Sequence, residues 1–148
     1  MRYKNILVPV DFSDGSNLAL SHAVDYAKTM GSTIHLLHII QPISYPIGME
    51  IAHYNFSDVE KEMIETSKRN LTDLTNLNEN SGVKFEVAVN IGSSSSTSII
   101  DFCKSENIDL VCIATHGSSG LEHFLFGSTT EKVLRKANCP VLVVRMQH

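Results

Sequence analysis

Segments with strand character and segments with helix character alternate along the whole chain. Strands are expected where apolar and β-branched residues run together or alternate, at 4–10, 33–40, 83–91, 109–114 and 139–145. Apolar residues recur at helical spacing between these segments, at 15–30, 57–82, after 98 and at 128–138. A strand followed by a helix and another strand makes a right-handed crossover between parallel strands, so helices cover both faces of the sheet. The sequence therefore predicts an α/β fold, with a doubly wound five-stranded parallel sheet sandwiched by helices.

Several of the expected helices carry residues that are typical of helix ends. The dipeptide Ser13–Asp14 supplies N-cap candidates for the first helix, and Gly31 is placed to end that helix in a left-handed conformation. A capping box, Ser57 to Glu60, is expected to open the second helix, and Gly82 to close it. The stretch 41–56 contains two prolines and a glycine, which predicts a loop or a lid.

Length, charge and hydropathy exclude several classes of protein. A chain of 148 residues fits one domain, 1–148, and a net charge of −4 without a block of Lys or Arg argues against a nucleic-acid surface. The apolar runs are far shorter than the roughly 18 residues that a membrane helix needs. The N-terminus enters a strand without a signal segment, so we expect a cytoplasmic protein. Three cysteines without a CxxC pair are expected to be buried, reduced thiols.

The segment between the fourth strand and the last helix is the strongest candidate for a binding site. Ligands of doubly wound sheets lie beyond the carboxyl ends of the strands, where this segment begins. Gly117 and Gly120 allow the backbone to approach an anion, and Gly127 precedes a second capping box, Ser128 to Glu131, at a helix N-terminus. The segment contains neither a Walker A loop nor a GxGxxG motif after the first strand.

A helix N-terminus alone cannot supply tight binding. It contributes about 0.3 to 2 kcal/mol to anion binding, whereas a micromolar dissociation constant requires about 8 kcal/mol. Burial of a base and additional hydrogen bonds at the ends of the first two strands would have to supply the rest. The alternative is that these glycines only shape a turn and that Ser128 only caps the helix.

Three segments of the chain resemble the universal stress protein family: KNILVPVDFS at the start, LLHII in the second strand, and ATHGSSGLEHFLFGSTTEKVLRKANCPVLVVR at the end. The resemblance covers nearly the whole length. It implies a fold of the adenine-nucleotide α-hydrolase type with strand order 3-2-1-4-5. ATP-binding members carry a glycine, two residues, a second glycine, nine residues, and then Gly-Ser/Thr. Gly117 and Gly127 match this pattern, whereas Ala114 stands in place of the first glycine. Binding should survive that change unless the position needs a positive φ.

The resemblance also implies roles for individual residues. It places Asp11 near the ribose or near a phosphate-bound Mg²⁺ or Mn²⁺. It places three residues around the adenine, namely Pro9, Val10 and Ile39. Six residues would face the ribose and phosphates, namely Thr115, His116, Gly117, Ser118, Ser119 and Gly120. Three hydroxyl residues would bind the phosphates, namely Ser128, Thr129 and Thr130. Family members also pair through the last strand, which implies a homodimer through Val141, Leu142, Val143 and Val144.

Several alternatives stay open at this stage. The carboxylate of Asp11 also suits a cap of the turn after the first strand, and His116 equally suits an ordinary loop position. A receiver-type phosphoacceptor site is disfavoured, because no second acidic residue adjoins Asp11. His35 and His38 are three apart on a strand and so face opposite sides, which argues against a histidine metal site.

The sequence therefore favours an ATP-binding regulatory protein of the stress response. One alternative is a slow Mg²⁺-dependent ATP hydrolase or nucleotidyl transferase. The other is a nucleotide-free dimeric interaction protein.

Overall fold

The computed structural model describes residues 3–42, 56–116 and 126–146. The five strands in these ranges belong to one parallel sheet with the order β3-β2-β1-β4-β5. Both the predicted fold class and the strand order are thus confirmed. The elements in chain order are β1 (Asn5–Pro9), α1 (Asp14–Met30), β2 (Thr33–Ile40), α2 (Phe56–Leu77), the 3-10 helix η1 (Glu79–Ser81), β3 (Lys84–Ile91), α3 (Ser95–Ser105), β4 (Leu110–Ala114), α4 (Ser128–Lys136) and β5 (Val141–Val144).

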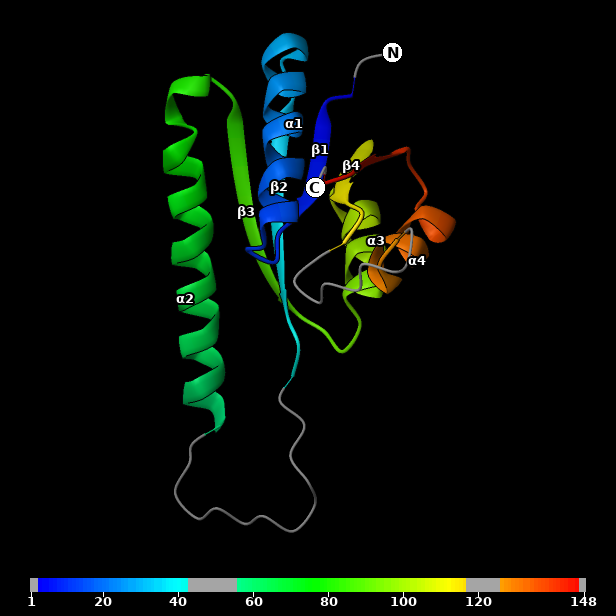
Figure 1. Cartoon of the computed structure of the whole chain (residues 1–148). Helices are drawn as coiled ribbons and strands as arrows, with labels where there is room; N and C mark the ends of the chain where they lie inside the picture. Colours follow the sequence, from blue (N-terminus) through cyan, green and yellow to red (C-terminus); the bar gives the residue numbers. More distant parts are fainter. Residues whose placement is uncertain (1–2, 43–55, 117–125, 147–148) are drawn as a thin grey trace.

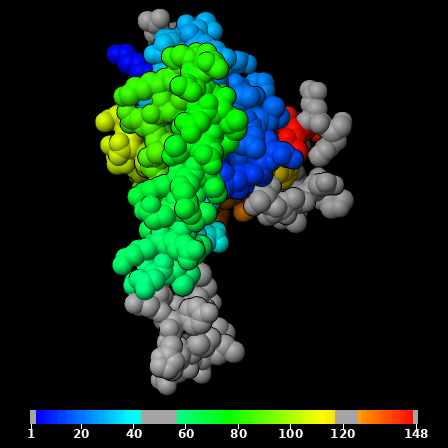
Figure 2. Space-filling model, turned by 90° about the vertical axis from the view of Figure 1, so that its left-hand side faces the viewer, coloured from blue at the N-terminus to red at the C-terminus, as the bar shows by residue number. Residues whose placement is uncertain are grey.

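Within the described residues, α1 and α2 cover one face of the sheet, and α3 and α4 cover the other (Figure 1). Alternate residues of β1, such as Ile6 and Val8, pack with α1 and α2, whereas Leu7 between them packs with α3 and α4. Because β1 and β4 are central, their side chains are apolar toward both layers, as the continuous apolar runs predict. Figure 2 shows α2 lying along one side of the molecule beside α1.

The ends of α1 follow the sequence prediction. The Ser13 side chain accepts a hydrogen bond from the Ser16 N–H, and Gly31 ends the helix with a φ of 69°. A left-handed residue at this position satisfies the last carbonyls of the helix, and the Gly31 N–H donates to the Ala27 carbonyl at 2.8 Å. The start of α1, next to the end of β1, is therefore fixed by local chemistry.

Both predicted capping boxes are wrong. Helix α2 begins at Phe56, so Ser57 lies inside its first turn, where its hydroxyl faces Asp58 at 3.5 Å. Helix α4 begins at Ser128, with Gly127 as a cap that has no side chain to contribute. Helix α2 also ends at Leu77, and Gly82 ends η1 instead. The sequence pattern S-x-x-E does not say which residue of a polar run leaves the helical conformation first.

The strand order reverses at β1, which lies between β2 and β4. Chain connections leave a crevice at such a switch point, beyond the carboxyl ends of the strands. Most of the predicted loop 41–56 lies outside the described residues. Within the described ranges, none of the helices is both long and apolar enough to cross a membrane.

Candidate functional site

A cavity of about 540 Å³ opens at the switch point, against the ends of β1, β2 and β4 and the first turns of α1, α3 and α4. Its volume lies within the range of small-molecule sites, about 300 to 1,000 Å³. The residues predicted for the site that line it are Pro9, Val10, Asp11, Ile39, Ala114, His116, Gly127, Ser128, Thr129 and Thr130. The fold therefore brings together predicted residues from both ends of the chain.

Thr115 is the one remaining predicted residue within the described ranges, and it does not line this cavity. Thr115 is buried, and both of its backbone groups form hydrogen bonds within the fold. Its N–H donates to the Val144 carbonyl at 2.9 Å, and its carbonyl accepts from the Gly127 N–H at 2.8 Å. The predictions for Gly117, Ser118, Ser119 and Gly120 lie outside the described residues.

The turn after β1 presents Asp11 at the cavity. The carboxylate oxygen Oδ1 of Asp11 accepts from the Ser13 N–H at 3.1 Å and from the Ser13 hydroxyl at 2.5 Å. The interpretation of Asp11 as a turn-capping residue is thus correct for one carboxylate oxygen. The same side chain is exposed and lines the cavity, so capping and ligand contact are compatible. The next residue, Phe12, has a φ of 62°, a left-handed conformation that is uncommon outside glycine.

The first turn of α4 supplies donors at the other side of the cavity. The first N–H groups of a helix have no intrahelical acceptor, which leaves those of Ser128, Thr129 and Thr130 for a ligand. The Thr130 hydroxyl donates to the Ala114 carbonyl at 2.8 Å and is buried, so this side chain fastens α4 to β4. The hydroxyls that remain for a ligand are therefore those of Ser128 and Thr129. Ser128 is exposed, and Thr129 is half-buried.

Ala114 is an ordinary strand residue. It pairs with Val144 in the sheet, and its φ is not positive. Its side chain belongs to the core that faces α1, where its Cβ lies 3.2 Å from the position that a Cβ on Gly15 would take. An alanine is therefore accommodated at this position without backbone strain.

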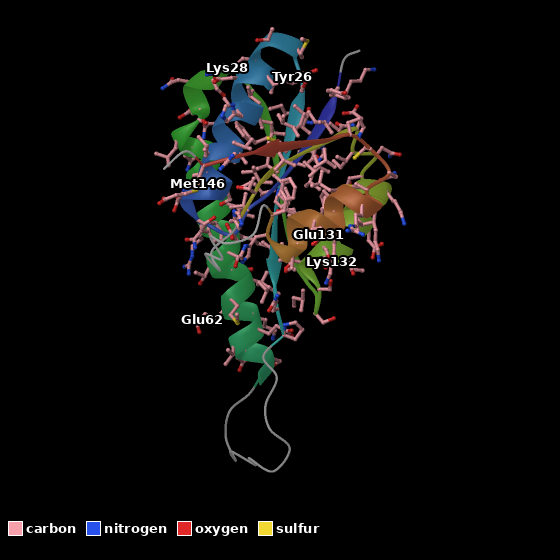
Figure 3. The ribbon with its side chains drawn as sticks, turned by 45° about the vertical axis from the view of Figure 1, so that its right-hand side comes forward. Tyr26, Lys28, Glu62, Glu131, Lys132 and Met146 are labelled. Carbon is pink, nitrogen blue, oxygen red and sulfur yellow. The ribbon has the colours of Figure 1, made fainter. Side chains whose placement is uncertain are left out.

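Sequence reasoning missed Gly15, which the site requires for close packing. A Cβ at this position would lie 2.7 Å from the His116 carbonyl oxygen and 3.4 Å from the Met146 sulfur. Figure 3 shows Met146 beside the start of α1. Both partners follow Gly15 by more than a hundred residues, so no local pattern predicts this contact.

Sequence reasoning also missed seven residues that line the cavity: Ser16, Leu37, His38, Gln41, Ser95, Ile99 and Ile113. Alternation along the strands would have found Leu37, because it shares a face with Ile39. Ser95 and Ile99 could not be found in this way, since they depend on how α3 packs over β2.

The sequence pattern of the universal stress protein family matches residues 2–145, which is almost the entire chain. This chain belongs to the universal stress protein family. Universal stress protein MJ0531 of Methanocaldococcus jannaschii is 31% identical over 143 residues, covering 97% of this chain and 82% of the relative.

Solved structures of other universal stress proteins have the same fold. That of MJ0577 from M. jannaschii superposes with a TM-score of 0.84 at 27% identity, covering 100% of this chain and 99% of the other. A universal stress protein from Archaeoglobus fulgidus, solved in complex with dAMP, has a TM-score of 0.65 at 23% identity, covering 97% and 98% of the two chains.

The titratable groups of this universal stress protein separate into structural groups and groups near the cavity. Burial raises the pKa values of Cys103 and Cys112 to about 12, so both remain neutral thiols, as expected for buried cysteines.

His35 and His38 lie on opposite faces of the sheet, as predicted: His35 contacts the Phe102 ring of α3, whereas His38 contacts the Phe12 ring. Among the described residues, no group of three His, Cys, Asp or Glu side chains is arranged to hold a metal ion.

Proposed function

We propose that this universal stress protein binds ATP in the cavity and acts in the cytoplasm as a nucleotide-dependent regulatory protein. One observation carries the proposal: a single cavity joins an apolar section to the open N-terminus of α4. The apolar section is formed by Leu37, Ile39, Ile99 and Ile113. An adenine ring would occupy that section, and the phosphates would lie against α4. The dAMP complex of the Archaeoglobus relative supports an adenine nucleotide as the ligand.

The two sections of the cavity have to act together. The helix terminus contributes at most about 2 kcal/mol of the roughly 8 kcal/mol that micromolar binding requires. Burial of about 120 Å² of ring surface would add about 3 kcal/mol. Hydrogen bonds that Ser128 and Thr129 donate to charged phosphate oxygens would add about 1.5 kcal/mol or more each. These contributions reach the micromolar range only when base and phosphates bind together, so adenosine alone should bind weakly.

Asp11 is the residue that would contact a cation accompanying the phosphates. Mg²⁺ is usually bound by one or two carboxylates together with phosphate oxygens. Because no prearranged group of three metal-binding side chains is present in the described part of the chain, the ion would arrive with the nucleotide. Omitting Mg²⁺ should therefore weaken ATP binding, and Mg²⁺ alone should not bind.

The edge strand β5 is the surface through which we propose that two copies pair. Leu142 is 42% exposed, and Val141 and Val143 are half-buried, so this edge presents apolar side chains beside unpaired backbone groups. Leu142→Lys should give a monomer by light scattering after gel filtration, while Leu77→Lys, at an exposed leucine on α2, should leave the dimer intact. A monomeric wild-type protein would rule out this pairing.

Calorimetric titration with ATP, ADP and AMP, with and without Mg²⁺, tests the proposed function. The key variant is Gly127→Val. A Cβ on Gly127 would lie 3.5 Å from the Thr115 carbonyl oxygen, an ordinary contact, so the fold does not itself require glycine there. We expect the variant to fold, with a loss of about 1 kcal/mol or less in the free energy of unfolding because valine is a poorer helix N-cap than glycine, and to lose at least tenfold in affinity for ATP. Unchanged affinity would contradict the site assignment.

Turnover separates a regulatory protein from an enzyme. Ordinary enzymes turn over at about 1 per second or faster. A purified protein that hydrolyses ATP at such a rate would require the regulatory proposal to be replaced by a hydrolase.

A further inference from the structure

Strand β2 holds both backbone groups of Val10, the residue that precedes Asp11. The Val10 N–H donates to the Leu37 carbonyl at 2.8 Å, which continues the pairing of β1 with β2. The Val10 carbonyl lies 2.7 Å from Nδ1 of His38, the next residue on β2. The second contact comes from a side chain and is not part of the sheet ladder.

The acceptor determines the protonation of the His38 ring at this contact. A carbonyl oxygen only accepts, so Nδ1 carries the hydrogen and donates it. In the neutral ring the other nitrogen, Nε2, is then an acceptor. The ring also packs against Phe12, with 4.7 Å between ring centroids and 41° between planes. His38 therefore contacts the residues immediately before and after Asp11.

The conformation of Phe12 needs such support. Its φ of 62° places a bulky residue in the left-handed region. Residues persist in such conformations only where the surrounding structure fixes them. The His38 hydrogen bond fixes the Val10 backbone from which the turn to Phe12 starts, and the ring contact with Phe12 is a secondary support. His38 itself lines the cavity.

We propose that His38 is a positioning residue for the nucleotide site: it holds the turn from Val10 to Phe12 so that Asp11 faces the ligand. The proposal deepens the proposed function and rests on it for its effect on affinity. The hydrogen donor is the feature that matters. Asparagine offers an amide hydrogen close to the position of Nδ1, whereas leucine offers none.

The first experiment needs no nucleotide. Nitrogen-15 spectra of the His38 ring should show hydrogen on Nδ1, and the Phe12 Cα and Cβ chemical shifts should report a left-handed backbone. In His38→Leu the Phe12 shifts should move toward those of ordinary extended or helical backbone, and in His38→Asn they should stay close to wild type. A ring protonated only on Nε2, or unchanged Phe12 shifts in His38→Leu, would overturn the proposal.

The second experiment measures ATP affinity. Loss of one hydrogen bond typically corresponds to about five- to tenfold in an equilibrium constant, so His38→Leu should weaken binding by about that factor. His38→Asn should restore most of the affinity. The control is His22→Leu, at an exposed histidine of α1, which should bind ATP as the wild type does. Each variant's free energy of unfolding identifies any loss that comes from destabilisation alone.

A double-mutant cycle with Asp11→Asn shows whether His38 acts through Asp11. If it does, the double variant should bind ATP about as weakly as the weaker single variant. Fully additive losses would overturn the assigned role. A wild-type protein that binds no nucleotide would refute the proposed function, while the Phe12 shifts would still decide whether His38 holds the turn.

Discussion

Gly15→Ala is expected to damage the site, because the added methyl group would clash with the His116 backbone that packs against Gly15. Gly15 lies in the first turn of α1 and is buried. Its added Cβ would lie 2.7 Å from the His116 carbonyl oxygen. Favourable contacts of carbon with other heavy atoms are about 3.5 Å long or more, so the two segments would have to separate by roughly 0.5 to 0.8 Å.

The His116 backbone cannot move away freely. The Thr115 N–H donates to the Val144 carbonyl at 2.9 Å, and the Thr115 carbonyl accepts from Gly127, so β5 and α4 both hold this segment. Overpacking of this kind costs about 1 to 3 kcal/mol. Alanine recovers at most about 1 kcal/mol through its higher helix propensity. We therefore expect a net loss of about 1 to 2 kcal/mol in the free energy of unfolding, or about 2 to 8 °C in Tm.

Urea denaturation and ATP calorimetry on the same samples would test this expectation. The matched control is Asn17→Ala, at an exposed position two residues further along α1, which should keep or slightly raise stability. Gly15→Ala should also lose ATP affinity, because the segment that must move carries His116 in the cavity wall. A Gly15→Ala protein as stable as wild type would refute the close-packing argument.

Three further predictions concern single side chains. Burial lowers the pKa of His35 below 6.5, against the opposing effect of the Glu86 carboxylate, so the unfolded state binds the proton first as pH falls. The free energy of unfolding should therefore rise with pH up to about 6.5. Urea denaturation of His35→Phe should show a flatter rise. Thr130→Val should cost about 1 to 2 kcal/mol in the free energy of unfolding, because the buried Ala114 carbonyl loses a donor, and Thr130→Ser should restore it. Alkylation of the folded protein should modify the half-buried Cys139 before the other two cysteines, as mass spectrometry of timed samples would show.

The fold was largely predictable because its central strands β1 and β4 are buried on both faces. Continuous apolar runs such as the one around Leu7 distinguish a covered parallel strand from a surface strand, and helical spacing between them implies crossovers. The order of the strands came from the family resemblance, not from these patterns. The cap at Ser13 was predictable because a side chain makes it, whereas the cap of α4 is Gly127, which has no side chain.

The candidate site was only half predictable, for a related reason. Residues that follow a strand directly, such as Asp11 and His116, are placed at the cavity by topology alone. The groups that hold them are distant in sequence: His38 is 28 residues from Val10, and Gly15 meets its partner only after three further strands have formed. Such contacts depend on side-chain packing between layers, which a single sequence does not reveal.

Contacts between α4 and the end of β4 indicate which part of the site stays in place when a ligand binds. The Gly127 N–H donates to the Thr115 carbonyl at 2.8 Å, and Thr130 donates to Ala114 at the same distance, so both ends of the segment between 116 and 127 are fastened to each other. Binding at the first turn of α4 therefore meets a preorganised backbone, which reduces the entropic cost of binding. A nucleotide that signals to a partner is accordingly expected to do so without displacing α4 from the sheet.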